Sequence, residues 1–179
     1  KLVAATVARF GRLDVLVNNA GGAMFVKPPE NLRPEQRRAP VPPNLNSVFY
    51  CSAAAGPQMI SQNGGRIINI SSVAGIKHSP AFIHYGAAKA GVINLTKSMA
   101  ACWGEHNINV NCIAPGLTAT EGVAQWLPAK TKEDGSPVPL LEYPPDPQHV
   151  ADLTLFLAAP GSARISGEIF PIRALTEIV

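Results

Sequence analysis

GRIINISSVAG, at residues 65–75, consists of a short apolar run followed by a polar end. The structure predicted for this segment decides the fold class expected for the whole chain. The run Arg66 to Ile70 is typical of a strand that is covered on both faces. Leu13 to Asn18 (LDVLVN) and Ile108 to Ile113 have the same character, and Glu168 to Ile172 is expected to form a final strand. Such runs predict a sheet of parallel strands, because only buried strands are apolar on both sides.

Helical patterns separate these strands. Lys1 to Phe10, Leu45 to Gln62 and roughly Ala81 to Trp103 have apolar residues at helical spacing. A fourth helix is expected to begin where Asp146 can cap it and Pro147 can occupy its first position. Strand and helix alternate, so we expect an α/β fold with a doubly wound parallel sheet and right-handed crossovers.

The composition narrows the class of protein. The chain has 179 residues, of which 46% are hydrophobic, so residues 1–179 are expected to form a single globular domain. The net charge of +3 is scattered along the sequence, which argues against nucleic acid or a membrane surface as partner. The longest uncharged stretch is interrupted by prolines and does not suggest a membrane span.

Cysteine and histidine give no sign of a metal site. Cys51, Cys102 and Cys112 lie in apolar stretches without a Cys-x-x-Cys pair, so we expect buried free thiols and a reducing, cytoplasmic location. The histidines lack the spacing that metal ligands need. They are His78, His84, His106 and His149.

Two segments are rich in proline. Six of the 17 prolines fall in Pro28 to Pro43 and six in Pro128 to Pro147, which indicates loops that cover or connect other parts. Residues 117–147 are expected to form a lid-like loop. Its apolar residues either cover a substrate or pack the lid down, and the sequence leaves both open. They are Trp126, Leu127, Leu140, Leu141 and Tyr143.

Tyr85 and Lys89 are the strongest candidates for chemistry. They are four residues apart on an expected helix, which places both side chains on one face. For proton transfer at neutral pH the pKa of a tyrosine must fall by roughly 2 to 3, or about 3 to 4 kcal/mol. An ammonium about 4 Å away can supply about 4 kcal/mol at an effective dielectric constant near 20. Taken alone, a Tyr-x-x-x-Lys pair is more often a surface or interface contact.

Two further polar sites lie at strand ends. Ser72 precedes Tyr85 by 13 residues and follows the strand at Arg66 to Ile70, at the carboxyl end where parallel sheets bind ligands. Asn18 to Gly21 (NNAG) ends the first strand in the same layer. Taken separately, the Ser72 segment and the NNAG segment could each be an ordinary turn.

In combination these segments resemble the short-chain dehydrogenase/reductase family. The resemblance rests on NNAG, Asn44-Leu45, GRIINISSVAG, YGAAKAG at Tyr85 to Gly91 and INVNCIAPGLTAT at Ile108 to Thr120, which occur in the family's order. It implies a Rossmann-like fold and a nicotinamide cofactor, NAD or NADP. The implied activity is hydride transfer between this cofactor and a small alcohol or ketone.

The resemblance also implies a role for each site residue. Tyr85 would be the general acid/base, and Lys89 would lower its pKa and bind the nicotinamide ribose. Ser72 would hold and polarise the substrate, and Asn44 would anchor a water chain that leads from Lys89 to solvent. The cofactor-binding residues would be Asn18, Ala20, Gly21, Tyr85, Lys89, Pro115, Gly116, Thr118 and Thr120.

By the same resemblance the two long helices would build a homodimer or homotetramer. A different class of function stays open, in which the chain is a catalytically silent relative that acts as a folding or oligomerisation partner. The family's fold starts with a strand, a glycine-rich turn and a helix that receives the cofactor pyrophosphate, and this sequence contains no such unit. We therefore expect a fragment of a longer polypeptide or a decayed gene product, with a bare strand edge at Leu13 to Asn18.

The prolines before Asn44 form a second departure from the family. Pro40, Pro42 and Pro43 disfavour helix in the residues that precede them, so the helix can hardly begin before Pro42 or Pro43. Asn44 is therefore expected in the first turn. There it could also be a helix-start residue without a catalytic duty.

Overall fold

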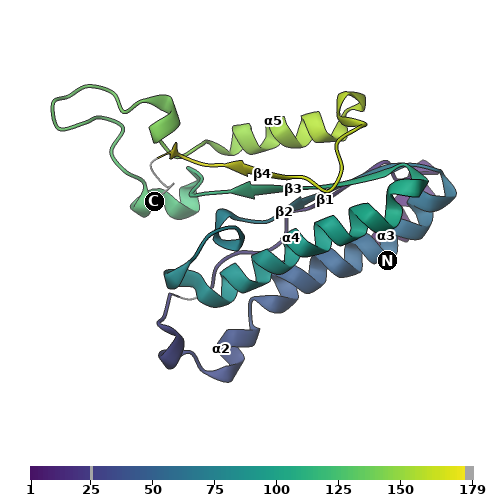
Figure 1. The fold of residues 1–179 in the computed structure, drawn as a ribbon, viewed down its shortest axis with the longest axis horizontal. Coiled ribbons are helices and arrows are strands. Elements are labelled where there is room, and N and C mark those ends of the chain that lie inside the picture. Colours follow the sequence, from purple (N-terminus) through teal and green to yellow (C-terminus); the bar gives the residue numbers. More distant parts are fainter. Residues whose placement is uncertain (25, 176–179) are drawn as a thin grey trace.

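Four parallel strands form the sheet in the computed structural model, which describes residues 1–24 and 26–175. The strands are β1 (Val15–Asn18), β2 (Gly65–Ile70), β3 (Ile108–Pro115) and β4 (Ile169–Ile172). They are arranged in the order β1-β2-β3-β4, and each strand pairs in parallel with the next (Figure 1). The expected α/β architecture with a parallel sheet is confirmed.

Helices cover both faces of this sheet. The helices α3 (Ser47–Ser61) and α4 (Ile83–Trp103) lie side by side on one face, and α5 (Pro147–Ala158) lies on the other (Figure 1). The first helix, α1 (Leu2–Phe10), packs beside α3, and the short α2 (Pro34–Arg38) lies in the first proline-rich segment. Short 3₁₀ turns occupy Pro29–Asn31, Val73–Gly75, Pro80–Phe82, Gly104–His106, Glu121–Trp126, Leu140–Glu142 and Pro160–Ser162.

The core is divided by the alternation of side chains along the strands. On β2, Ile67 packs toward α3 and α4 in a cluster with Met59 and Val110. Its neighbour Ile68 packs toward α5 in a cluster with Leu157. Because successive strand residues point to opposite faces, a run such as RIINI is needed to fill both layers.

The helix ends agree with the sequence signals. The backbone N–H of Asp146 donates to Nδ1 of His149 at 3.0 Å, within a capping box that starts α5 at Pro147. The last turns of α4 carry Met99 and Trp103 into the core. No helix among the described residues is long and apolar enough to cross a membrane.

One expectation about the cysteines is wrong. Cys112 is buried in β3 and Cys51 is partly buried, but Cys102 is exposed. Cys102 lies in the last turn of α4 between two core residues, Met99 and Trp103. The helical turn therefore directs its side chain away from the sheet. All three thiols are free.

The strand β1 forms an edge of the sheet. It pairs only with β2 among the described strands, and Val17 on it is 43% exposed. This agrees with the bare apolar edge that the sequence suggested.

Candidate active site

Tyr85 and Ser72 meet at the carboxyl end of β2. Ser72 follows this strand and begins the 3₁₀ turn Val73–Gly75, where its Oγ accepts the N–H of Ala74 at 3.2 Å. Tyr85 lies in the first turn of α4, near enough to Ser72 for the serine side chain to affect its pKa. The ring of Phe82 packs edge-on against Tyr85, with 6.4 Å between the ring centroids. The turn and the helix start thus bring two hydroxyl groups together.

Lys89 lies one helical turn after Tyr85 and is almost completely buried, at 4% exposure. Its Nζ donates a hydrogen bond to the carbonyl oxygen of Ile70 at 2.8 Å and lies 5.6 Å from the centroid of the Tyr85 ring. Burial lowers the pKa of Lys89 to about 8, because the charged form loses its hydration. The ammonium therefore still carries most of its charge at pH 7.

The pKa of Tyr85 moves in the direction opposite to our expectation. Burial raises it above the ordinary value of 10, and the hydrogen bond from Ser72 offsets only part of the increase. The charge of Lys89, whose Nζ donates to the carbonyl oxygen of Ile70, does not reverse this increase. The structure places the pair on one helix face, as predicted, but without the predicted fall in the pKa of Tyr85.

Two further residues lie next to Lys89, Ser71 and Cys112. The Oγ of Ser71 donates to the carbonyl oxygen of Lys89 at 2.8 Å and ties β2 to α4. The buried Cys112 lies close enough for the charge of Lys89 to affect it, and burial raises the pKa of this thiol to about 11. The thiol is thus neutral at pH 7 and forms no ion pair with Lys89.

Gly75 allows the turn after Ser72 to contact α4 directly. A Cβ at this position would lie 2.6 Å from the carbonyl carbon of Lys89 and 2.7 Å from the backbone nitrogen of Ala90. Backbone atoms cannot move aside as a flexible side chain can. The spacing between Ser72 and the helix that carries Tyr85 and Lys89 therefore depends on a glycine here.

We expect Gly75→Ala to lower the free energy of unfolding by about 1–3 kcal/mol, since the added methyl group must push the turn away from α4. Urea unfolding would measure this change. Gly122→Ala is the matched control, because a Cβ there meets nothing within 4 Å. Equal stability of the two variants would contradict the close contact.

Asn44 lies in the first turn of its helix, as the prolines predicted. A π-helical turn, Pro42–Asn46, precedes α3 and buries Asn44 completely. Its Nδ2 donates to the carbonyl oxygens of Pro40 at 2.9 Å and Gly22 at 3.1 Å, and its Oδ1 accepts the N–H of Gly22 at 2.9 Å. The amide thus fixes the loop after NNAG. These contacts match the role of a helix-start residue; the proposed water chain stays a prediction.

Asn18 uses its side chain within the core. Its Nδ2 donates to Oδ1 of Asn69 at 2.8 Å and to Oγ of Ser52 at 3.1 Å. Asn69 in turn donates to Oγ1 of Thr96 at 2.9 Å. This buried network connects β1, β2, α3 and α4. Of the NNAG residues, Asn19, Ala20 and Gly21 are exposed, so the loop after the strand faces outward.

A groove of about 600 Å³ lies between the carboxyl side of the sheet and α5. Pro115, Thr118 and Thr120 line it, three of the four residues expected in the segment after β3. Val17 and Ile70 supply an apolar wall. Gly116 does not line it, and its N–H donates to the carbonyl oxygen of Ile172 at 2.8 Å.

The lid-like loop leaves its largest apolar residues in solvent. Trp126, Leu140 and Leu141 are 60%, 78% and 65% exposed. These three side chains therefore do not pack the lid against the rest of the protein. For them, covering a substrate is the interpretation that stays open. Among the described residues no group of three or more His, Cys, Asp and Glu could hold a metal ion.

Comparison with known proteins agrees with this geometry. The family model for short chain dehydrogenases matches residues 1–131. The chain belongs to this family. A 3-oxoacyl-[acyl-carrier-protein] reductase FabG from Thermotoga maritima is 39% identical over 176 residues, covering 96% of this chain and 69% of the relative. A 3alpha-hydroxysteroid dehydrogenase from Mediterraneibacter gnavus is 39% identical over 163 residues, covering 91% of this chain and 64% of the relative.

Several solved structures have the same fold. ElxO with bound NADP has a TM-score of 0.85 at 29% identity, covering 96% of this chain and 70% of that chain. NAD⁺-bound xylitol dehydrogenase has a TM-score of 0.85 at 28% identity, covering 97% and 72%. Acetoin dehydrogenase YohF from Salmonella typhimurium has a TM-score of 0.80 at 33% identity, covering 96% and 67%.

Proposed function

We propose that this chain carries the proton-transfer site of an NAD(P)(H)-dependent oxidoreductase that interconverts an alcohol and a ketone. The observation that carries the proposal is the proximity of the side chains of Tyr85 and Ser72 at the carboxyl end of a central parallel strand. Lys89 lies one turn away in the same helix. A substrate oxygen that inserts between the two hydroxyls would receive a hydrogen bond from each.

In the direction of reduction, Tyr85 donates its hydroxyl proton to the oxygen of the substrate carbonyl. Ser72 donates a hydrogen bond to the same oxygen and so stabilises the negative charge that develops on it. In the direction of oxidation, Tyr85 accepts the proton. The high pKa of Tyr85 keeps the phenol protonated before the reaction, which suits a proton donor.

The residues around the groove fit a nicotinamide cofactor. The groove has an apolar wall for a flat ring and the hydroxyls of Thr118 and Thr120 for polar groups, and Asn19 of the exposed loop also lines it. When bound, the cofactor supplies or accepts the hydride. Lys89 would hydrogen-bond the ribose and, with its charge in place, ease the release of the proton from Tyr85.

NAD and NADP both stay open as the cofactor, since structural relatives of this chain are known with each. The related reductases and hydroxysteroid dehydrogenases support a carbonyl or secondary alcohol as substrate. The exposed Trp126, Leu140 and Leu141 on the lid-like loop suit an apolar substrate, which they would cover on closing. A cytoplasmic location stays a prediction.

Titration with NADH and NADPH, followed by nicotinamide fluorescence, tests the proposed function directly. We expect enhanced or shifted emission with at least one of the two, since the groove shields a bound ring from water. Thr118→Trp would fill the groove and should abolish the signal, while Thr131→Trp on the exposed part of the lid should not. Absence of binding at millimolar cofactor would remove the enzymatic proposal for this chain.

The catalytically silent alternative rests on a different surface. Phe49 and Tyr50 on α3 are 49% and 64% exposed, and they line a groove that α4 completes with Gly91 and Leu95. This face would support the expected homodimer or homotetramer whether or not the chain turns over substrate. Turnover of any ketone by the purified chain, lost on changing Tyr85, would decide against the silent role.

A further inference from the structure

A second cavity lies at the amino ends of the strands, away from Tyr85 and Ser72. It has a volume of about 860 Å³ and is formed by the connections α1 to β1, α3 to β2 and α5 to β4, together with the last turns of α4. We call it the amino-end hollow. Its charged residues are Arg12, Asp14, Arg66, Lys97 and Arg164.

The amino-end hollow holds the whole net charge of the chain. Four of its charged residues are cationic and one is acidic. The sequence has 15 Lys and Arg and 12 Asp and Glu, so removing these five leaves eleven of each. The excess of +3 is therefore gathered in one concave surface, although its members come from positions 12 to 164 of the sequence.

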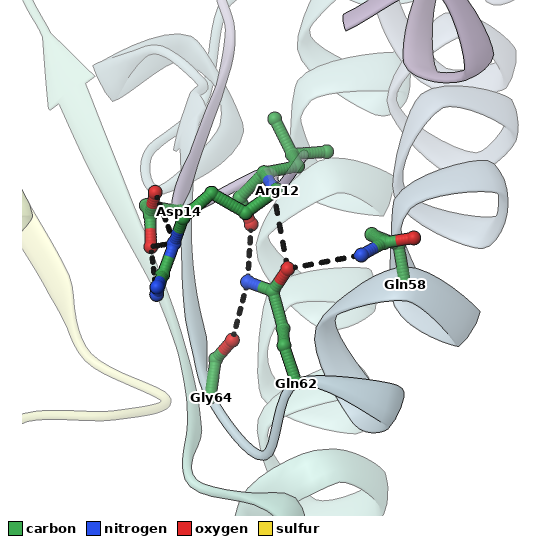
Figure 2. Close-up of polar contacts among 6 residues, drawn as sticks. Arg12, Asp14, Gln58, Gln62 and Gly64 are labelled. Carbon is green, nitrogen blue, oxygen red and sulfur yellow. Dashed lines mark hydrogen bonds and ion pairs between the residues drawn. The ribbon is translucent and has the colours of Figure 1, made fainter. Parts of the chain in front are cut away.

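Only one of the four cations is neutralised. Nε of Arg12 donates to both carboxylate oxygens of Asp14, at 2.8 and 3.0 Å (Figure 2). Among the residues that the structure describes, no carboxylate forms an ion pair with Arg66, Lys97 or Arg164. Three positive charges thus line the hollow without a counter-charge from residues 1–24 and 26–175.

Arg66 is the most constrained of these three. It lies on β2 in register with Val15 and Asn109, and its backbone N–H donates to the carbonyl oxygen of Asp14 at 2.9 Å. Its Nε is buried and has no hydrogen-bond partner among the described residues. A buried N–H group of a cation normally has an acceptor, so this atom points to an acceptor that the protein does not supply.

The wall beside Arg12 is held in a fixed shape by Gln62. Its Nε2 donates to the carbonyl oxygens of Leu13 at 2.7 Å and Gly64 at 3.1 Å, and its Oε1 accepts the N–H of Leu13 at 3.2 Å. Gln58 donates a further hydrogen bond to this oxygen at 3.1 Å (Figure 2). These hydrogen bonds tie the connection between α1 and β1 to the turn between α3 and β2. The hollow is therefore preformed and does not require a ligand to assemble it.

We propose that the amino-end hollow binds a multiply charged, phosphate-bearing small molecule. A guanidinium group matches the geometry of phosphate oxygens with parallel N–H donors, and two guanidinium groups with one ammonium match a polyanion better than a single carboxylate. The volume is within the range of small-molecule sites. Arg66 binds from the sheet, Lys97 from α4, and Arg164 from the connection before β4.

Calorimetric titration with inorganic pyrophosphate at 0.15 M salt tests the proposal. The wild-type chain should bind at one site. The double variant Lys97→Gln/Arg164→Gln should weaken binding by about tenfold or more, since each charge-assisted contact is strong. Both side chains are exposed, so the fold should tolerate the change.

The matched control is Arg38→Gln/Lys132→Gln, which removes two exposed cations outside the hollow. It should change the dissociation constant by less than about twofold. Arg66→Gln should weaken binding as the first double variant does. Absence of binding at millimolar pyrophosphate, or equal weakening in both double variants, would overturn the proposal. Because the readout is binding of pyrophosphate, its result does not depend on turnover at Tyr85.

Discussion

Replacing Tyr85 with phenylalanine is expected to reduce turnover by about 10²–10⁴-fold, the usual contribution of a positioned acid/base group. The change removes the hydroxyl proton beside Ser72 and keeps the ring that packs against Phe82. Loss of the hydroxyl contact with Ser72 should cost about 1 kcal/mol of stability at most. Steady-state oxidation of NADH or NADPH with a panel of small ketones would measure the effect.

Tyr50→Phe is the control for this prediction. It removes a hydroxyl group from an exposed position on α3, so turnover should stay at the wild-type level. Cofactor binding by the Tyr85→Phe variant should also stay nearly unchanged, which separates a lost proton donor from a lost fold. Turnover near the wild-type value in Tyr85→Phe would refute the assigned role. Ser72 and Lys89 would then have only structural roles.

The periodic parts of the fold could be predicted from the sequence because they depend on local physics. The apolar runs gave all four strands, and the strand that was expected to begin at Leu13 begins at Val15. The prolines correctly placed Asn44 in a first turn, because proline restricts the residue before it whatever the tertiary context. The capping signal at Asp146 was equally local.

The buried polar network could not be predicted in this way. Asn18 and Asn69 are 51 positions apart in the sequence, and Asn69 and Thr96 are 27 apart. Their pairing depends on the register between β1 and β2 and on the rotation of α4 about its axis. Neither can be inferred from the residue pattern of a single sequence. NNAG indicated a cofactor turn, but its first residue serves the core, and Asn19, the residue after it, lines the groove.

Charge shows the same limitation. The sequence suggested a scattered excess of cations with no electrostatic role, whereas the fold brings Arg66, Lys97 and Arg164 to one cavity. In a parallel sheet the amino ends of all strands lie at one edge. Residues from three different connections therefore meet there even when no two of them are close in sequence.

For Lys89 the sequence argument treated only its attraction to Tyr85 and left out desolvation. At 4% exposure, the loss of hydration affects the lysine more than any neighbour does, and it lowers the pKa from 10.5 to about 8. Holding this charge inside the protein at pH 7 therefore costs about 3 kcal/mol of folding free energy. A variant without the ammonium would leave the carbonyl oxygen of Ile70 without this donor, which costs about 1–2 kcal/mol and offsets part of the gain.

Lys89→Met is therefore expected to stabilise the fold by about 1–2 kcal/mol at pH 7, while it abolishes the contribution of Lys89 to turnover. Methionine has a similar length and no charge to desolvate. Urea unfolding at pH 7 would measure the gain in stability. Lys97→Met, on an exposed position of the same helix, is the control and should leave stability within about 0.5 kcal/mol of the wild type.

The pH dependence of unfolding tests the cause of this gain. Between pH 8 and 10.5 the unfolded chain still binds a proton on Lys89 that the folded chain has released. The contribution of Lys89 to the free energy of unfolding therefore rises with pH across this window, and the penalty is complete below pH 8. The Lys89→Met variant lacks this pH dependence. The difference in the free energy of unfolding between the variant and the wild type should therefore shrink as pH approaches 10.5. An advantage that stays constant with pH would show that packing, and not the buried charge, is responsible.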